Sequence, residues 1–209
     1  MTSRLSRLTQ ARVVPVLRYA DADTAFYAAE AAAQAGFASL ELTWTIPGVA
    51  QVLAALRQQH GDRLLLGVGT LTDAAQAEAV LAAGADFLVS PAVATEIVAP
   101  ARQAGALCLL GAFTPTEVLA ALRAGADVVK IFPADSGGPA HLAALRAVFP
   151  EAAFCPTGGI ARGNMADYFK AGATFVGIGS SLFDKQAFAA RDTAAVVAGA
   201  RAILEAAHA

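Results

Sequence analysis

Lys130 combines a reactive side chain with an apolar setting. It lies in the run Val-Val-Lys-Ile-Phe at residues 128–132, whereas the other two lysines, Lys170 and Lys185, are placed at a helix end and in a late loop. A lysine is rarely buried without a partner or a role. Burial removes hydration from the ammonium and favours the neutral amine, which can attack a ketone to form a Schiff base. The alternative is a structural lysine that pairs with a carboxylate at the end of its strand.

Glu41 is the second candidate for chemistry. It lies in the run Ser-Leu-Glu-Leu-Thr at residues 39–43, so that Ser39, Glu41 and Thr43 share one face of an expected strand. A lone buried carboxylate is unfavourable unless it is paired or used. Beside Lys130 it satisfies both conditions, as an ion-pair partner at rest and as a general base during turnover. We also place Thr43 in the substrate pocket.

Two glycine-rich segments near the C-terminus predict an anion site. The segments are Thr-Gly-Gly-Ile at residues 157–160 and Gly-Ile-Gly-Ser-Ser at residues 177–181. We expect them to follow the seventh and eighth strands and to offer backbone amides near helix starts to a phosphate. These segments contain Gly158, Gly159, Gly179 and Ser180. The alternative is that the glycines serve only to make tight turns.

Other strand ends carry weaker signals. Arg18 ends the first apolar run, where its guanidinium is suited to binding a substrate carboxylate or to a surface salt bridge. Thr70 is placed to donate its hydroxyl to the same carboxylate. Pro91 and Phe132 are expected to form an apolar wall of the pocket.

An internal repeat predicts the fold that would bring these residues together. An alanine-rich helical stretch, the pair Ala-Gly and a short apolar run recur five times, with the glycines at Gly36, Gly84, Gly105, Gly125 and Gly172. The intervals before Gly84 and after Gly125 are about twice the others, so each is expected to contain one more unit. Together with the opening apolar run, these units predict eight strands. The expected strands span residues 13–17, 38–43, 64–68, 86–90, 106–110, 127–131, 152–155 and 174–178.

Eight strands that alternate with helices predict an α/β protein in which residues 1–209 form a single (β/α)8 TIM barrel with a short N-terminal helix. A doubly wound open sheet is the alternative. That fold would normally show a dinucleotide-binding glycine motif after the first strand, whereas Arg18-Tyr19-Ala20 follows here. In a barrel, the strand ends that carry the candidate residues converge on one face.

The composition limits the partners. Hydrophobic residues make up 56% of the chain and charged residues only 15%, against about 25% in a typical domain. This favours an oligomer that covers apolar helix faces. The formal net charge is −2 without a basic run, which argues against nucleic acid, and no apolar stretch is long enough for a membrane span. We expect reduced, buried cysteines, a cytoplasmic location, no metal and no cofactor.

Taken together, the motifs PVLR, LELT, GVGT, SPA, VKIFPA, CPTGGI and GIGSSL, in this order, resemble the class I aldolases for 2-keto-3-deoxy-6-phosphogluconate and 2-keto-3-deoxy-6-phosphogalactonate, a family that also cleaves 4-hydroxy-2-oxoglutarate. The resemblance runs from about residue 11 to the C-terminus and implies a homotrimer without metal or organic cofactor. It implies that Lys130 forms the Schiff base, that Glu41 moves the protons and that Gly158, Gly159, Gly179 and Ser180 bind the phosphate. The expected products are pyruvate and glyceraldehyde 3-phosphate.

The resemblance also contains a conflict about the substrate. Phosphogluconate-type members usually carry an arginine four residues after the glutamate, where this chain has Thr45. Phosphogalactonate-type members carry an arginine at the end of the first strand, as Arg18 does here. Thr157, which is suited to bonding the C4 hydroxyl, is closer to the phosphogluconate pattern. We therefore expect both C4 epimers to be accepted.

Two other classes of function are also compatible with the sequence. The first is a phosphate-binding TIM barrel, such as an isomerase, decarboxylase or synthase, in which Lys130 acts only through its charge. The second is an oligomeric binding or scaffold protein without catalysis, which the expected burial of both Lys130 and Glu41 argues against. A Schiff base on Lys130 separates the aldolase from both.

Overall fold

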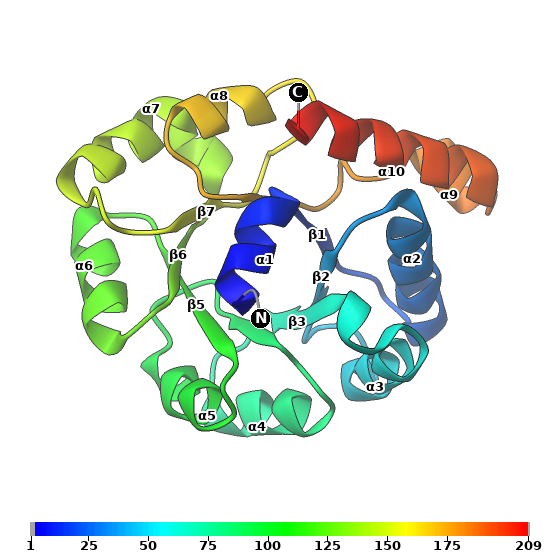
Figure 1. The fold of residues 1–209 in the computed structure, drawn as a ribbon, viewed down its shortest axis with the longest axis horizontal. Helices are drawn as coiled ribbons and strands as arrows, with labels where there is room; N and C mark the ends of the chain where they lie inside the picture. Colours follow the sequence, from blue (N-terminus) through cyan, green and yellow to red (C-terminus); the bar gives the residue numbers. More distant parts are fainter. Residues whose placement is uncertain (1–2, 209) are drawn as a thin grey trace.

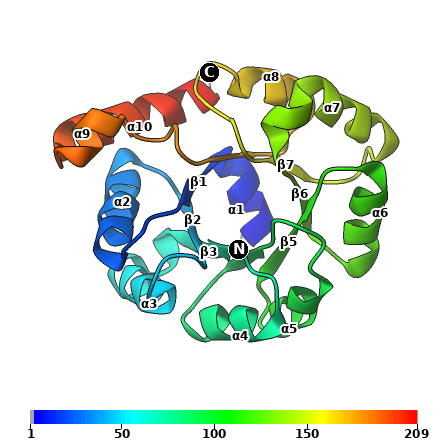
Figure 2. The ribbon, with the colours of Figure 1, turned by 180° about the vertical axis from the view of Figure 1, so that it is seen from behind.

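The computed structural model describes residues 3–208, so that residues 1, 2 and 209 of the expected barrel lie outside the described part. Figures 1 and 2 show strands in the centre and helices around them. The parallel strands are β1 (Val13–Leu17), β2 (Ser39–Thr43), β3 (Leu65–Gly69), β4 (Phe87–Val89), β5 (Leu107–Ala112), β6 (Val128–Ile131), β7 (Phe154–Pro156) and β8 (Val176–Ile178). They follow one another around a nearly closed barrel, β8 pairs with β1, and a bridge between Thr157 and Gly177 joins β7 to β8.

The helices lie between the strands, as the repeat predicts. They are α1 (Arg4–Ala11), α2 (Ala22–Ala35), α3 (Val49–His60), α4 (Ala74–Ala82), α5 (Val98–Gln103), α6 (Pro115–Ala124), α7 (Ala134–Val148), α8 (Met165–Lys170), α9 (Lys185–Ala189) and α10 (Thr193–His208). Two short 3-10 helices, η1 (Gly61–Arg63) and η2 (Thr95–Ile97), precede β3 and α5. Among the residues described, no helix is both long and apolar enough to cross a membrane.

Local sequence signals fix where these helices begin and end. The side chain of Asp21 caps α2, and Thr114 and Glu117 form a reciprocal capping box at the start of α6. Gly36 and Gly125 end the same two helices in the left-handed conformation, with φ values of 104° and 97°. Glycine adopts this conformation without the steric penalty of a Cβ atom. Each helix therefore stops where the next strand has to start.

The predicted fold is confirmed. All eight strands are present, with ends within two residues of the predicted ranges, and the N-terminal helix forms. The open doubly wound sheet is excluded because the strands follow one another in chain order, β8 pairs with β1, and the Thr157–Gly177 bridge joins the two edge strands β7 and β8. Cys108 and Cys155 are free and buried, and burial raises the pKa of the Cys108 thiol to about 12.

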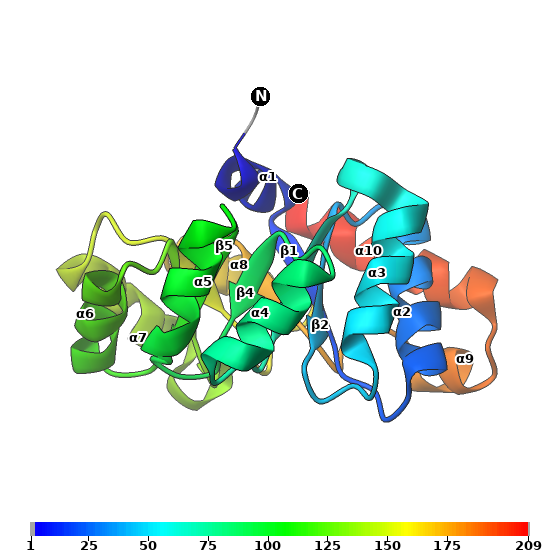
Figure 3. The same ribbon diagram turned by 90° about the horizontal axis from the view of Figure 1, so that it is seen from below.

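Helix α1 lies across one end of the barrel, opposite the loops that follow β1 and β2 (Figure 3). Its Leu8 is fully buried among the side chains inside the barrel, including Phe87, Leu109 and Phe175. Burial of a leucine side chain contributes roughly 2 kcal/mol. Leu8 thus closes the apolar interior at the end where the strands begin.

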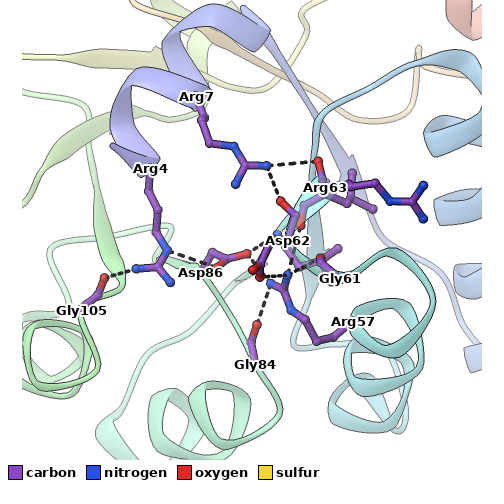
Figure 4. A network of polar contacts seen from close by, with 11 residues as sticks. Arg4, Arg7, Arg57, Gly61, Asp62, Arg63, Gly84, Asp86 and Gly105 are labelled. Carbon is purple, nitrogen blue, oxygen red and sulfur yellow. Dashed lines mark hydrogen bonds and ion pairs between the residues drawn. The ribbon is translucent and has the colours of Figure 1, made fainter. Parts of the chain in front are cut away.

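A polar network around Asp86 holds α1 in this position (Figure 4). The Asp86 carboxylate lies 3.2 Å from Arg4 Nε of α1, pairs with the Arg57 guanidinium of α3 and accepts a hydrogen bond from the Leu66 amide of β3. Only 7% of Asp86 is exposed. Because three elements satisfy one buried carboxylate, the network connects the helix to the start of β3 and β4.

We expect Leu8→Ala to lower the free energy of unfolding by about 3 kcal/mol, because the shorter side chain leaves a cavity in the closed end. Equilibrium unfolding in guanidinium chloride measures the change. Gln10→Ala is the control, since Gln10 is an exposed residue of the same helix. An effect of Leu8→Ala no larger than that of the control would show that α1 does not seal the barrel.

Candidate active site

A cavity of about 490 Å³ opens at the end of the barrel where the strands finish. Such a volume is within the range of small-molecule sites, and this end of a (β/α)8 barrel is where active sites lie. Residues that follow β1, β3, β4, β6, β7 and β8 contribute to its lining, together with α9. The lining residues are Val16, Arg18, Tyr19, Thr70, Pro91, Lys130, Phe132, Thr157, Gly158, Gly159, Ile160, Gly179, Ser180, Phe183, Lys185 and Phe188.

Lys130 of β6 and Glu41 of β2 form an ion pair inside the barrel. Lys130 Nζ lies 3.6 Å from Glu41 Oε1, and the two residues are 5% and 4% exposed. Lys130 Nζ also lies 5.4 Å from the centre of the Phe132 ring, which packs at the cavity wall. An amine held in apolar surroundings, with one carboxylate beside it, has the arrangement required for attack on a carbonyl carbon and for proton transfer.

The free oxygen lone pairs of Glu41 support a role in proton transfer. Glu41 Oε1 is fully buried and accepts no hydrogen bond from any residue between 3 and 208. Its ion-pair partner Lys130 Nζ lies 3.6 Å away, just beyond hydrogen-bond distance, whereas most buried polar atoms in folded proteins have a hydrogen-bond partner. The oxygen is therefore available to a reacting group brought beside Lys130.

Gly69, the last residue of β3, makes room for this carboxylate. It pairs in register with Thr43 of β2, and a Cβ atom added to it would lie 1.9 Å from Glu41 Oε1. Any other residue type at this position would force the carboxylate to move. Glycine at the end of β3 is thus required by the close approach of Glu41 rather than by a turn.

Two threonines hold Arg18 at the cavity, and a third contacts one of them. Its guanidinium donates hydrogen bonds of 2.8 Å to Thr45 Oγ1 and to Thr70 Oγ1, and Thr45 in turn contacts Thr43 Oγ1 at 3.0 Å. Thr70 has a φ of 66°, an unfavourable value for a β-branched residue that is found mainly where function requires it. The guanidinium therefore reaches the position beside Thr45 from β1 rather than from β2.

The two glycine-rich loops follow β7 and β8, and both line the cavity. Gly158 and Gly159 are both left-handed, with φ values of 100° and 70°, and their amides donate no hydrogen bond within the described residues. Asn164 fixes the loop by donating to the Gly159 carbonyl, and Ser181 donates from the other loop to the Ile160 carbonyl. Backbone amides fixed in this way can bind an anion.

One expectation about these loops is wrong. The sequence suggested that helix N-termini would present the amides, but α8 begins only at Met165, five residues after Ile160, and contains six residues. The intervening segment is used for the Asn164 contacts that shape the loop. The candidate donors are therefore amides of the loop itself.

Comparison with known proteins identifies the family of this chain. The sequence model of the KDPG and KHG aldolases matches residues 5–198. The chain belongs to this family. It is 33% identical over 176 residues to the 2-dehydro-3-deoxy-6-phosphogalactonate aldolase of Escherichia coli K12, with 84% of this chain and 86% of the relative covered. It is 35% identical over 199 residues to the 2-dehydro-3-deoxy-phosphogluconate aldolase of Treponema pallidum, with 95% and 94% covered.

A solved aldolase has the same fold. The KDPG aldolase of Legionella pneumophila, captured with pyruvate as a covalent carbinolamine intermediate, is 29% identical and superposes with a TM-score of 0.86 over 95% of this chain and 97% of its own. Family membership and fold therefore agree with the resemblance seen in the motifs.

Most residues predicted for an aldolase site lie together at the cavity. Ten of the twelve line it: Arg18, Thr70, Pro91, Lys130, Phe132, Thr157, Gly158, Gly159, Gly179 and Ser180. Glu41 lies beneath the lining, in contact with Lys130. Thr43 does not line the cavity, because it is fully buried and its hydroxyl contacts Thr45 instead. Thr43 therefore does not form part of the pocket wall, as the sequence had suggested. It contacts Thr45, which accepts a hydrogen bond from Arg18.

Three aromatic residues and one lysine at the cavity were not predicted from the sequence. Tyr19, Phe183, Phe188 and Lys185 also line the cavity of this aldolase-family chain. Burial raises the pKa of the Tyr19 hydroxyl to about 12, so this wall stays neutral at physiological pH. The only available signal was their position just after β1 and β8. Among residues 3–208, no group of three or more His, Cys, Asp and Glu residues is arranged to hold a metal ion.

We expect Gly69→Ala to lower kcat roughly 10- to 100-fold in an aldolase assay, because the new methyl group displaces the Glu41 carboxylate from Lys130. The fold should persist, since the group that must move is the end of a side chain. Gly163→Ala is the matched control, because a Cβ atom there meets nothing within 4 Å. Equal kcat values for the two variants, with unchanged melting temperatures, would show that the position of Glu41 is not critical.

Proposed function

We propose that this protein is a class I aldolase that reversibly cleaves a 2-keto-3-deoxy-6-phospho sugar acid to pyruvate and glyceraldehyde 3-phosphate. The observation that carries the proposal is the buried pair of Lys130 and Glu41, 3.6 Å apart at the inner end of the cavity. Membership of the aldolase family supports this activity, and the chemistry of the site supports the roles that we propose for its residues.

The first half of the reaction forms the electron sink. Lys130 passes a proton to Glu41, the resulting neutral amine attacks the C2 ketone, and loss of water from the carbinolamine, with that proton returned, leaves a protonated imine. Glu41 is positioned beside the nitrogen to accept the proton that the amine gives up and to supply one to the departing hydroxyl. The positive imine then withdraws electrons from the C3–C4 bond.

The second half breaks that bond and restores the enzyme. Glu41, directly or through a water molecule, takes the proton of the C4 hydroxyl, the C3–C4 electron pair moves into the imine, and the aldehyde product leaves. The remaining enamine is protonated at C3 to give the imine of pyruvate. Water adds to C2 of that imine, and pyruvate leaves as Lys130 becomes a free amine again.

The two ends of the cavity suit the two ends of such a substrate. Arg18 and Thr70 are connected by a hydrogen bond of 2.8 Å and offer donors for the C1 carboxylate. Gly158, Gly159, Gly179 and Ser180 line another part of the cavity and offer amides and a hydroxyl for the phosphate. Pro91 and Phe132 complete the wall near Lys130 and keep the imine away from water.

We propose that both C4 epimers are substrates. The relatives described above include one aldolase of each kind, at 33% and 35% identity. Arg18 is the feature of the phosphogalactonate type, whereas Thr157, 6% exposed at the cavity wall, is suited to contacting a C4 hydroxyl as in the phosphogluconate type. A 4-hydroxy-2-oxoglutarate substrate is the alternative, with a second carboxylate in place of the phosphate.

Assembly as a homotrimer in the cytoplasm is part of the same proposal. Leu119 of α6 and Val148 of α7 are large apolar residues with 38% and 64% exposure, which a neighbouring subunit would cover. The low share of charged residues, 15%, supports oligomerisation in the same way.

Borohydride reduction in the presence of pyruvate tests the proposal. We expect the protein to gain the mass of one reduced pyruvate group per chain, on the peptide that contains Lys130, because the imine with pyruvate is reduced to a stable amine. Lys130→Met should form no adduct and release no pyruvate from either phosphorylated epimer. Lys170→Met is the control, since Lys170 is an exposed lysine in α8 that pairs with Asp167.

The adduct also separates the aldolase from a phosphate-binding barrel without covalent catalysis. Wild-type protein that binds the phosphorylated acids but forms no adduct on Lys130 would favour the second class. An active Lys130→Met variant would contradict the proposed chemistry directly.

A further inference from the structure

Lys185 is a cation in the cavity wall that the proposed reaction does not use. It is the first residue of α9, just after the loop that contains Gly179 and Ser180, and it lines the cavity together with them. The side chain is exposed and forms no ion pair with any residue in the range 3–208. A lysine at the start of a helix is electrostatically unfavourable, because the helix dipole is positive there. Its position is therefore not explained by the stability of α9.

The short helix that carries Lys185 is firmly held. Asp184 caps it, accepting hydrogen bonds from the amides of Gln186 and Ala187 at 3.0 and 2.9 Å. The Phe188 ring stacks on Phe183 at 5.1 Å and on Tyr19 of the β1 loop at 5.3 Å. Lys185 is thus presented from an ordered segment rather than from a free loop.

The same aromatic group extends to α2. Phe188 packs at 5.3 Å against Tyr27 of that helix, and the guanidinium of Arg191, just after α9, lies 4.7 Å from the centre of the Tyr27 ring. The Tyr19, Phe183 and Phe188 rings that line the cavity carry no charge and offer few hydrogen-bond partners to a phosphate. On this side of the cavity, a doubly charged group would therefore need a cation.

We propose that Lys185 binds the distal phosphate of the substrate and makes the enzyme selective for phosphorylated substrates. The inference rests on the proposed function for the identity of the substrate, but the anion site can be tested separately. Gly158, Gly159, Gly179 and Ser180 supply neutral donors, and Lys185 adds the positive charge that they lack. A charge-assisted hydrogen bond is stronger than a neutral one, and the ammonium interacts with a phosphate as a point charge.

This assignment divides the cations of the cavity between the ends of the substrate. Arg18 is bonded to Thr45 and Thr70, on the side of β2 and β3, whereas Lys185 follows the loop of β8. Lys130, on β6, is already paired with Glu41. Of the cations that line the cavity, Lys185 is thus the one carried by the segment that follows the β8 glycine loop.

Lys185→Gln, with Lys170→Gln as the matched control, tests the inference. Both variants lose one positive charge from an exposed lysine, but only Lys185 lines the cavity. Titration calorimetry with inorganic phosphate should give a Kd about fivefold higher for Lys185→Gln than for wild type, as expected for one exposed charge interaction. Lys185→Arg should recover most of the affinity, and Lys170→Gln should bind as wild type does.

Kinetics supply the second measurement. In pyruvate release from the phosphorylated acids, Lys185→Gln should raise KM about fivefold while kcat changes less than twofold, because the phosphate is remote from the bond that breaks. Formation of the reduced pyruvate adduct on Lys130 should be unchanged, since pyruvate carries no phosphate. Cleavage of 4-hydroxy-2-oxoglutarate should respond less than that of the phosphorylated acids, because one carboxylate carries less charge than a phosphate.

The outcomes separate this inference from the proposed function. A Kd for inorganic phosphate and a KM that are the same in Lys185→Gln, Lys170→Gln and wild type would overturn the role of Lys185, whatever the adduct shows. Absence of the pyruvate adduct in wild type would overturn the aldolase chemistry, while the calorimetry would still report on Lys185. If Lys185→Gln and Lys170→Gln weakened phosphate binding equally, the loss would be explained by the net charge of the protein. That result would also contradict the inference.

Discussion

The ion pair of Lys130 and Glu41 is the interaction on which the site depends, because two ionisable groups are almost completely buried side by side. Each residue is at most 5% exposed, and the nitrogen and oxygen are 3.6 Å apart. Removing either charge alone from water is highly unfavourable, and mutual attraction offsets only part of that penalty. Burial of either charge is therefore tolerated only because the opposite charge lies beside it. The barrel has to position both side chains together.

The strands set this geometry from opposite parts of the sheet. Glu41 lies in register with Gly67 of β3 and Val16 of β1, whereas Lys130 lies in register with Gly111 of β5 and Cys155 of β7. Because the sheet closes on itself, the two side chains meet across its interior. Leu8 and the Asp86 network close the opposite end, so the interior stays apolar beneath the pair. The end where the strands begin is therefore closed by packing, and the end where they finish carries the cavity.

The periodic features of the fold could be predicted from the sequence. Alternation placed Lys130 on the same face as Val128, and the repeated Ala-Gly units located the strands to within two residues. The residues at the strand ends could be read in order, because every βα loop of a barrel opens on the same face. Ten of the twelve expected site residues line the cavity for this reason.

Contacts between distant segments could not be predicted in the same way. Asp86 looks like an ordinary acidic residue before a strand, and only the folded chain brings Arg4 and Arg57 to it. In the sequence, Thr45 was notable only because phosphogluconate-type aldolases usually have an arginine at this position. The structure shows that Thr45 accepts a hydrogen bond from Arg18. Lys185 could be placed only in a loop by its sequence, because its approach to the cavity depends on the packing of Phe188. Each of these cases depends on side-chain packing that has no period in the sequence.

Exchange of the methyl protons of pyruvate with deuterium oxide, followed by NMR, tests most directly whether the two buried residues divide the work as we describe. Imine formation on Lys130 should make these protons acidic, and Glu41 should remove them. We predict rapid exchange with wild type and, for Glu41→Gln, exchange slowed by roughly 100-fold or more although the reduced adduct on Lys130 still forms. Exchange by Glu41→Gln at the wild-type rate would contradict the central claim that the carboxylate beside Lys130 moves the protons.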